Sequence, residues 1–405
     1  MKKTNLIFKL VAAALVVCLT LSMCVSCNGS NEAVLTLTVD GKDYTMTESE
    51  FSLLMKIKKL DYACSMLITT SQDASVWSQV YDEEEGTTYE DVYKELIVKQ
   101  AKAILVEKYL FDSLDLTISE DKLAEHREEM TSEIKSQGGK GAYKQYYGYT
   151  ANDYYTTYVQ MVDRSELVLD ELYGEDGAYK VTDEDLAKYY TENYVGYQFI
   201  MLDMENKVVR DDDGNRIVET EEDEDGNEVE SDAYKTEALS DDEKSEKQIL
   251  ADKILAELEA GTATFEELIE KYSDEYYSVE FPEGQFVLAD GTFIDSAVTE
   301  AVKDLEIGEY TTEAISVNSD AYQYIVKRVE LKENAYNDDK YLELFDGYED
   351  TVMYDKYETY VMTFFDKITV NETVLAKYTM ANTFLSEYAD AYYQYYLYYY
   401  YGISY

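Results

Sequence analysis

The sequence predicts an α+β protein in which a segment of alternating strands and helices interrupts a mainly helical chain. Three observations predict this. Apolar residues recur at helical spacing over about 48–193, short apolar runs typical of strands appear from 195 onward, and helical spacing returns from about 336 to 366. With 405 residues, the chain is too long for one ordinary core, so two or three domains are expected.

The first 26 residues are expected to be a lipoprotein signal peptide. Three lysines precede an apolar run over 10–21, which is too short to span a membrane. The following LSMCVSC resembles a bacterial lipobox, in which Cys27 fits the small-residue rule and Cys24 is the alternative. Lipidation of Cys27 predicts an extracytoplasmic chain anchored to the outer face of the bacterial cell membrane. An ordinary secretory signal that is cut nearby is the other interpretation.

Charge excludes one class of partner. Residues 1–26 hold three of the 35 basic and none of the 85 acidic side chains, which leaves 32 basic side chains and a formal net charge of −53. Such a surface repels nucleic acid and anionic lipid head groups, so acyl chains would hold the protein to the membrane instead. Beyond Cys27 only Cys64 and His126 remain as soft metal ligands, so neither a disulfide, a zinc site nor another cofactor is expected.

The N-terminal part, residues 27–193, is predicted to be a hairpin followed by helices. VLTLTVDGKDYTMT (34–47) alternates in polarity and contains Asp40-Gly41, a hairpin signal. Thr47 and Glu50 form a capping box for the first helix. Further helix starts, each with an acid in the first turn, are at Ser119, Thr150 and Thr182.

Residues 203–246 form a strongly acidic insertion after the strand pattern at 195. DDDGN and DEDGN begin twelve residues apart, at 211 and 223. Glu221, Asp223, Asp225 and Asp232 fall at positions 1, 3, 5 and 12 of a loop, which makes calcium coordination conceivable. The alternative is two Asp-Gly-Asn hairpin turns in a solvated insertion.

A regular α/β pattern runs from 247 to 331. One helix places Leu250, Ile254 and Leu258 on a single face, and the next begins at a capping box of Thr264 and Glu267. A third apolar stripe covers 297–305, and 309–317 and 321–331 look like paired strands. Ten tyrosines end the chain in 388–405. We expect packing for 372–390 and exposure for the end, where the rings could bind clients or settle at a membrane interface.

Four segments in this order resemble the parvulin-type (PpiC-type) prolyl isomerase domain: TFEELIEKYSDE (264–275), GQF (284–286), LEIGEYT (305–311) and YIVKRVE (324–330). LDLTISEDKL, GGKGAYKQYYGYTANDYYTTYVQ and VTDEDLAKYYTENY resemble helix boundaries in the chaperone domain of the PrsA/SurA foldases. The resemblance implies a helical chaperone domain at 27–193, an inserted domain at 194–333 with a small antiparallel sheet flanked by helices, and helices at 334–387 that return to the chaperone domain.

The resemblance also implies a site, from which this sequence departs. Active members have an apolar pocket of Met and Phe over a floor with two histidines and a Cys or Asp. Here the histidine positions hold Phe199 and either Gln323 or Tyr324, and the Cys or Asp position holds Glu275. The Met and Phe positions of the pocket hold Ile294 and Val298, so the aromatic wall is expected to be missing. Phe286 is a further residue that aligns with the pocket. His126 lies in the helical region and is expected to be structural.

The expected function is therefore that of a membrane-anchored foldase or chaperone for unfolded exported polypeptides, with weak or absent prolyl isomerisation. An active isomerase is one alternative. A surface lipoprotein that binds cations or wall polymers through 203–246 and 388–405 is another. A homodimer is conceivable. No nucleotide-binding loop, nucleophile elbow or metalloprotease motif occurs in the sequence.

Overall fold

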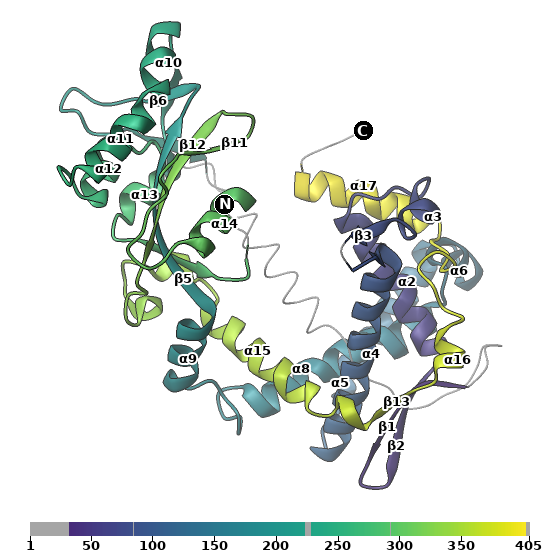
Figure 1. Ribbon diagram of the computed structural model, residues 1–405. Coiled ribbons are helices and arrows are strands. Elements are labelled where there is room, and N and C mark those ends of the chain that lie inside the picture. Colours follow the sequence, from purple (N-terminus) through teal and green to yellow (C-terminus); the bar gives the residue numbers. More distant parts are fainter. Residues whose placement is uncertain (1–31, 84, 223–227, 292, 402–405) are drawn as a thin grey trace. The chain divides into compact units, whose positions relative to one another are not determined.

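A computed structural model describes residues 32–83, 85–222, 228–291 and 293–401 (Figure 1). The chain forms two compact units. Of the described residues, unit 1 comprises those up to Val181 together with those from Asp350 onward, and unit 2 comprises those in Thr182–Glu349. Helices and small antiparallel sheets make up both, which confirms the α+β prediction. The predicted signal peptide and both candidate lipidation residues, Cys27 and Cys24, lie outside the described residues.

Unit 1 is mainly helical. Its elements are β1 (Ala33–Val39), β2 (Lys42–Thr47), α2 (Glu48–Ser65), α3 (Asp73–Val76), β3 (Val80–Asp82), β4 (Thr87–Thr88), α4 (Tyr89–Ser113), α5 (Glu120–Ser136), α6 (Lys140–Tyr147), α7 (Ala151–Asp153), a π-helical turn η1 (Tyr154–Val159), α8 (Gln160–Tyr173), most of α15 (Tyr348–Met362), η4 (Phe365–Lys367), β13 (Ile368–Val370), α16 (Glu372–Leu375) and α17 (Tyr388–Tyr401).

The predicted hairpin and helix starts are confirmed. Asp40 and Gly41 have positive φ angles of 52° and 78°, as a tight hairpin turn requires. Strand β13 then pairs antiparallel with β1, so residues near both ends of the chain share one three-stranded sheet. At α2, Thr47 Oγ1 accepts from the Glu50 amide and the Glu50 carboxylate accepts from the Thr47 amide. Side-chain caps also begin α5, α7, α9 and α12 at Ser119, Thr150, Thr182 and Thr264.

The core of unit 1 lies between α4, the hairpin, α2, α8 and the later turns of α15. Ile97, Ala101 and Leu105 are fully buried at helical spacing on α4, as the sequence pattern predicted. Tyr357 and Val361 enter the same core from α15. Residues distant in sequence therefore bury one another, which stabilises unit 1 through the removal of apolar surface from water.

This core contains a buried acid, Glu107 on α4. Tyr357 Oη donates to Glu107 Oε1 over 2.6 Å, and the second carboxyl oxygen has no hydrogen-bond partner among the described residues. Burial raises the pKa of Glu107 well above its ordinary value of 4.5, against the smaller opposing effect of the tyrosine. The folded chain therefore holds this proton more tightly than the unfolded chain does.

Glu107→Gln is expected to stabilise unit 1 more at about pH 8 than at about pH 5. Because the pKa is higher in the folded state, the stability that this group contributes is present below the unfolded pKa and is lost as the pH rises toward the folded one. Urea midpoints at the two pH values measure the difference. Glu95→Gln, at an exposed position on the same helix, is the matched control. An equal effect of Glu107→Gln at both pH values would show that Glu107 does not hold its proton in this way.

Unit 2 is built around one sheet. Its elements are α9 (Asp183–Asn193), β5 (Tyr194–Asp203), β6 (Asn206–Val208), β7 (Val218–Glu222), β8 (Glu228–Tyr234), β9 (Thr236–Ala238), α10 (Asp241–Gln248), α11 (Leu250–Glu259), α12 (Phe265–Tyr272), α13 (Tyr276–Glu280), β10 (Gln285–Leu288), α14 (Ser296–Asp304), β11 (Ile315–Val317), β12 (Tyr322–Val329), and the 3₁₀ turns η2 (Ala335–Asn337) and η3 (Leu342–Phe345).

The four strands follow the order β10-β5-β12-β11, and every neighbouring pair is antiparallel. Side chains alternate between the two faces of β5. Ile200 and Leu202 face α11 and α12, whereas Phe199 and Met201 face α14. Figure 1 shows these helices on opposite sides of the sheet.

The acidic insertion forms two further strand pairs, β6 with β9 and β7 with β8. Arg216 attaches this insertion to the rest of unit 2, because its guanidinium donates to the carbonyls of Glu270 (2.5 Å) and Ser273 (3.2 Å).

One expectation from the sequence is wrong: the helix predicted from 336 begins only at Tyr348. Asn334 and Gly347 both have positive φ angles, and the residues between them form η2 and η3 instead.

In the part of the chain that the structure describes, no helix combines the length and the apolar run that crossing a membrane needs.

Candidate functional site

The positions that the resemblance assigns to histidines lie on the central strands β5 and β12 of unit 2. Phe199 and Tyr324 come from these neighbouring strands and face α14, with ring centroids 5.9 Å apart. Phe199 is 3% exposed, Tyr324 is 8% exposed, and Val298 of α14 is fully buried beside them. The structure therefore brings these three predicted site residues together, but as a closed core.

Gln323 does not belong to this group. Gln323 pairs with Leu202, whose side chain faces α11 and α12. Residues that pair directly across two strands lie on the same face, so Gln323 lies on the face opposite to Phe199. The register pairs Val326 with Phe199 and Met201 with Tyr324, which places Tyr324 on the face of Phe199. Of the two candidates for the last histidine position, Tyr324 is the one that shares the face.

Two other expected pocket residues also lie elsewhere. Ile294 is 44% exposed and has a φ of 63°, a left-handed conformation that is rare for a β-branched residue. Phe286 is buried but faces the opposite side of the sheet, where its ring lies 5.3 Å from that of Tyr341. Strand register sets the face of Phe286, because a one-residue offset turns a side chain to the other side of the sheet, whereas Ile294 lies in the loop between β10 and α14.

Two aromatic residues that the sequence did not predict, Tyr197 and Phe293, pack in the core beside Phe199. The rings of Tyr197 and Phe293 lie 4.7 Å apart, and Tyr197 also stacks on Phe199 at 5.8 Å. The expectation of a missing aromatic wall is therefore wrong. The alternation along β5 could have identified Tyr197, two residues before Phe199, whereas Phe293 lies in a loop without a periodic signal.

Glu275 lies next to this aromatic cluster. Its carboxylate caps α13 by accepting from the Ser278 amide over 2.6 Å. Burial raises the pKa of Glu275, and these backbone hydrogen bonds oppose the rise. Burial also raises the pKa values of Tyr197 and Tyr324, and the charge of Glu275 raises both further. A carboxyl group thus remains near the expected position, but its hydrogen bonds go to its own helix.

Strand β10 pairs only with Tyr194–Tyr197 of β5, and the segment before Glu275 bonds to the rest of that edge. Asp274 donates its amide to the Met201 carbonyl (2.8 Å), and Ser273 Oγ accepts from the Met201 amide (3.1 Å). Asp274 Oδ2 accepts from the Asp203 amide (3.0 Å). This edge therefore offers no unpaired backbone at these positions to an incoming peptide.

The two histidines that the resemblance assigns to an isomerase site are absent from this face of the sheet. The chain's one histidine, His126, lies on α5 in unit 1, where it is buried with Nε2 3.3 Å from Asp163 Oδ2. Phe199, Val298 and Tyr324 expose almost no surface, so a prolyl ring would have to displace packed side chains to reach them.

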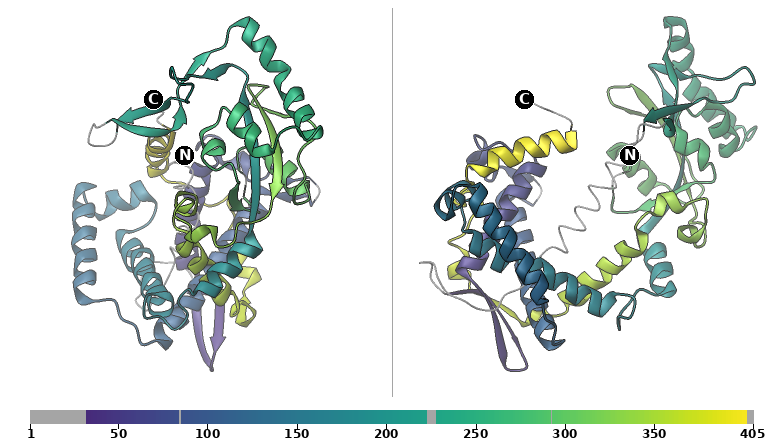
Figure 2. Two further views of the ribbon diagram at one scale, coloured as in Figure 1. Left: turned by 90° about the vertical axis from the view of Figure 1, so that its left-hand side faces the viewer. Right: turned by 180° about the vertical axis from the view of Figure 1, so that it is seen from behind.

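An exposed aromatic surface occurs in unit 1 instead, on the last helix. Tyr395, Tyr398 and Tyr399 of α17 are 58%, 64% and 54% exposed, and their spacing places them on one face. We call these three rings the tyrosine face. The other side of α17 buries Ala389 and Leu397, and the helix contacts α2 and α6. The views in Figure 2 show α17 within unit 1. Val374, Leu375 and Met380 are buried, whereas Phe384 is 72% exposed, so the packing expected for 372–390 is present only in part. The exposed rings near the end agree with the expectation.

Of the four calcium candidates, Glu221 and Asp232 lie within the described residues. Asp232 accepts a hydrogen bond from Tyr277 Oη over 2.8 Å, and Glu221 lies in β7 opposite Val229. Asp223 and Asp225 lie outside the described residues. Within the described ranges, no group of three or more His, Cys, Asp or Glu side chains is placed to hold a metal ion.

Comparison with known proteins gives only distant similarity. No protein-family model and no curated protein matches the chain. Among solved structures it is similar to PrsA from Bacillus subtilis, with 17% identity, a TM-score of 0.23, and coverage of 75% of this chain and 93% of that one. It is also similar to the foldase protein PrsA from Streptococcus pneumoniae, with 15% identity, a TM-score of 0.22, and coverage of 84% of this chain and 96% of that one. The foldase protein PrsA from Lactococcus lactis is similar with 13% identity, a TM-score of 0.21, and coverage of 85% of this chain and 97% of that one. Because these TM-scores are below 0.5, membership in the PrsA/SurA foldases stays a prediction.

Proposed function

We propose that the protein is an extracytoplasmic chaperone that binds unfolded exported polypeptides without catalysing prolyl isomerisation. One observation carries this proposal: the sheet face expected to hold the isomerase site is a closed aromatic core, whereas the tyrosine face of α17 is open to solvent. Exposed apolar rings grouped on one helix face are typical of a surface that binds other chains.

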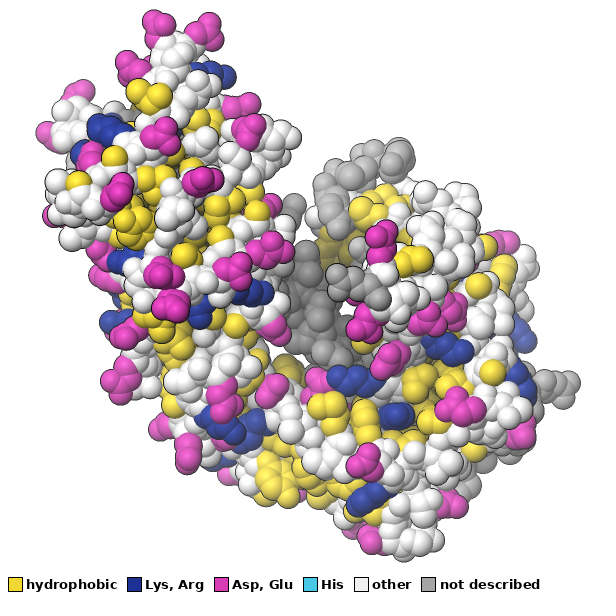
Figure 3. Space-filling view, viewed as in Figure 1, with side chains coloured by type: hydrophobic (Ala, Val, Ile, Leu, Met, Phe, Trp, Pro, Cys, Tyr) yellow, Lys and Arg dark blue, Asp and Glu magenta, His cyan; other side chains and the backbone are white. Residues whose placement is uncertain are grey.

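The tyrosine face suits partners of varied sequence. A tyrosine ring offers apolar area together with a polar edge, so it can contact apolar side chains and still hydrogen-bond a backbone. Acidic side chains are spread over the surface in view in Figure 3. With a formal net charge of −50, the chain would attract basic segments of a client and keep the complex soluble.

The closed core argues against the active-isomerase alternative. Rotation about an X-Pro bond faces a barrier of roughly 18–20 kcal/mol, which active parvulins lower with polar groups beside an accessible pocket. Here Phe199 and Tyr324 replace those groups and bury each other. A protease-coupled assay on a proline peptide is expected to show no acceleration over the uncatalysed rate. Turnover that disappears on substitution of Glu275 would reverse this conclusion.

Attachment to the membrane through Cys27 is part of the proposal. It accounts for the apolar segment that precedes this cysteine, and it would hold the binding surface near the site where exported chains emerge. The mass of the chain extracted from bacterial membranes tests it, because acylation of Cys27 adds the mass of the lipid.

Replacing the tyrosine face is expected to weaken client binding. Each exposed ring is worth about 1 kcal/mol, so Tyr395→Ser/Tyr398→Ser/Tyr399→Ser should raise the apparent Kd by about a hundredfold. Fluorescence anisotropy with a labelled, permanently unfolded model protein (reduced and carboxymethylated α-lactalbumin) measures the change.

The matched control replaces three similarly exposed aliphatic residues of unit 2, as Ile249→Ser/Ile307→Ser/Leu342→Ser. This variant should bind the unfolded protein as the original chain does. Equal losses in both variants would mean that binding is a general property of exposed apolar surface, and the tyrosine face would then have no particular role.

A further inference from the structure

The segment before α17 is attached to the N-terminal helices of unit 1 by a series of contacts. Lys377 Nζ lies 2.8 Å from Glu48 Oε1, and the ring of Tyr378 lies 5.4 Å from that of Phe51. Further along, Thr70 donates to Asp390 (2.7 Å). Between these points, residues 379–383 form a single compact turn, which we call the plug.

The plug holds its own shape. The Thr379 amide donates to Asn382 Oδ1 (3.0 Å), and the Asn382 amide donates to Thr379 Oγ1 (3.0 Å). The Thr383 amide closes the turn on the Thr379 carbonyl (3.0 Å). A single turn of this kind leaves free amides at its start and free carbonyls at its end.

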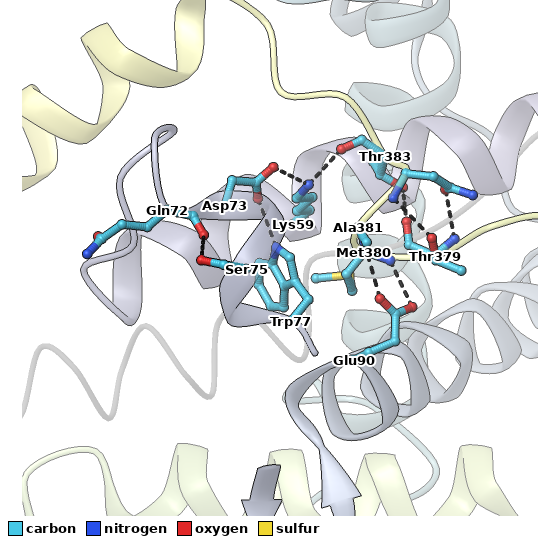
Figure 4. A network of polar contacts seen from close by, with 11 residues as sticks. Lys59, Gln72, Asp73, Ser75, Trp77, Glu90, Thr379, Met380, Ala381 and Thr383 are labelled. Atoms are coloured by element: carbon cyan, nitrogen blue, oxygen red, sulfur yellow. Dashed lines mark hydrogen bonds and ion pairs between the residues drawn. The ribbon is translucent and has the colours of Figure 1, made fainter. Parts of the chain in front are cut away.

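Opposite charges bind the two ends of the plug, as Figure 4 shows. The carboxylate of Glu90 accepts from the amides of Met380 (2.8 Å) and Ala381 (3.2 Å). At the other end, Lys59 Nζ donates to the Thr383 carbonyl (2.7 Å). A negative group at free amides and a positive group at a free carbonyl both stabilise a turn.

Beneath the plug, Lys59 and Trp77 are fully buried, and Asp73 and Glu90 are partly buried. Lys59 is 0% exposed and forms an ion pair with Asp73 at 2.7 Å, and Asp73 also accepts from Trp77 Nε1 at 2.8 Å. Met380 is fully buried in the core of unit 1. An unbranched thioether side chain fits irregular apolar gaps, so Met380 acts as the anchor of the plug.

We propose that Lys59, Asp73, Trp77 and Glu90 form a peptide-binding site that the chain's own plug occupies. The site would accept from another polypeptide a one-turn segment with an unbranched apolar side chain and free amides at its start. It contacts backbone amides, one backbone carbonyl and one apolar side chain, so many sequences satisfy it. This inference goes beyond the proposed function, because it concerns a second site that is distinct from the tyrosine face.

Occupation by the plug sets the apparent affinity of the site. A ligand in solution binds only the fraction of molecules whose plug has left, so its apparent Kd is weakened by that fraction. The plug and its partners lie far apart in sequence, by 290 residues for Glu90 and Met380 and by 324 for Lys59 and Thr383. Release of the plug therefore requires no break in α2 or α4.

The test uses the full chain and a labelled synthetic peptide with the sequence of residues 377–386, KYTMANTFLS. In a Met380→Asp chain, the plug loses its anchor and the site opens. The peptide should bind this variant about tenfold or more tightly than it binds the original chain. A peptide in which Asp replaces the methionine should not bind.

A second substitution distinguishes a binding site from simple loosening. Met380→Asp/Glu90→Gln should lose the gain in peptide affinity, whereas Met380→Asp/Glu95→Gln, altered at an exposed position of the same helix, should keep it. Trp77 fluorescence shows whether each variant folds. If Met380→Asp does not fold, Met380→Ala replaces it, with a smaller gain expected. Equal peptide affinity for the original chain and the opened variant, or a gain that does not depend on Glu90, would overturn the proposal.

Discussion

Asp73→Ala is expected to lower the free energy of unfolding of unit 1 by about 3–5 kcal/mol, because it leaves a buried ammonium group without its counter-ion. Lys59 has no exposed side-chain surface, and burial lowers its pKa while Asp73 opposes that change. The substitution also removes the acceptor for Trp77 Nε1. Urea unfolding followed by the fluorescence of Trp77, the only tryptophan of the chain, measures the loss.

The chain offers a matched control in a second Lys–Asp pair. Lys42 and Asp112 lie 2.8 Å apart, but both side chains are exposed, so Asp112→Ala should have a far smaller effect. Lys59→Met/Asp73→Ala should recover much of the stability, since it removes both charges together. A similar loss for Asp73→Ala and Asp112→Ala would show that Lys59 is reached by water in solution.

Phe199→Ala is expected to lower the free energy of unfolding of unit 2 by about 3–5 kcal/mol. The ring is buried against Tyr197, Tyr324 and α14, so its removal leaves a cavity in the core. Hydrogen exchange of the amides of β5, followed by mass spectrometry, reports the change within unit 2. Ile294→Ala serves as the control, because the resemblance also assigns Ile294 to the pocket but the structure leaves it exposed.

The outcome decides between a core and a pocket. A core loses stability when Phe199 is truncated and stays without isomerase activity. An open pocket would tolerate the truncation with little loss of protection in β5. That second result, together with tighter binding of proline peptides, would restore the active-isomerase alternative.

Local chemistry predicted much of the fold. The turn at Asp40-Gly41, the capping boxes at Thr47 and Thr264, and the buried strand at 195 each depend on a few neighbouring residues, and each is present. The prediction of a helix from 336 was wrong although the apolar residues have helical spacing. Gly347 has a positive φ angle, which interrupts a helix, so α15 begins only after it. Helical spacing alone does not exclude a turn of that kind.

The site was harder to predict, because it depends on register and on long-range contacts. Gln323 and Tyr324 differ by one position and face opposite sides of the sheet, and only strand pairing distinguishes them. No pattern in the sequence links Glu90 to Met380 or Lys59 to Thr383, since each pair meets only through the tertiary fold. Resemblance to a family gave the order of the elements but not these contacts.

The pairing of β13 with β1 has a consequence for synthesis. A chain that leaves the ribosome from its N-terminus presents β1 early, but the strand that completes its sheet is Ile368–Val370. All of Thr182–Glu349 emerges before that strand. Unit 2 can thus finish folding while unit 1 still lacks β13 beside β1 and Met380 in its core. During that time the protein is itself an incompletely folded chain, of the kind that it is proposed to protect.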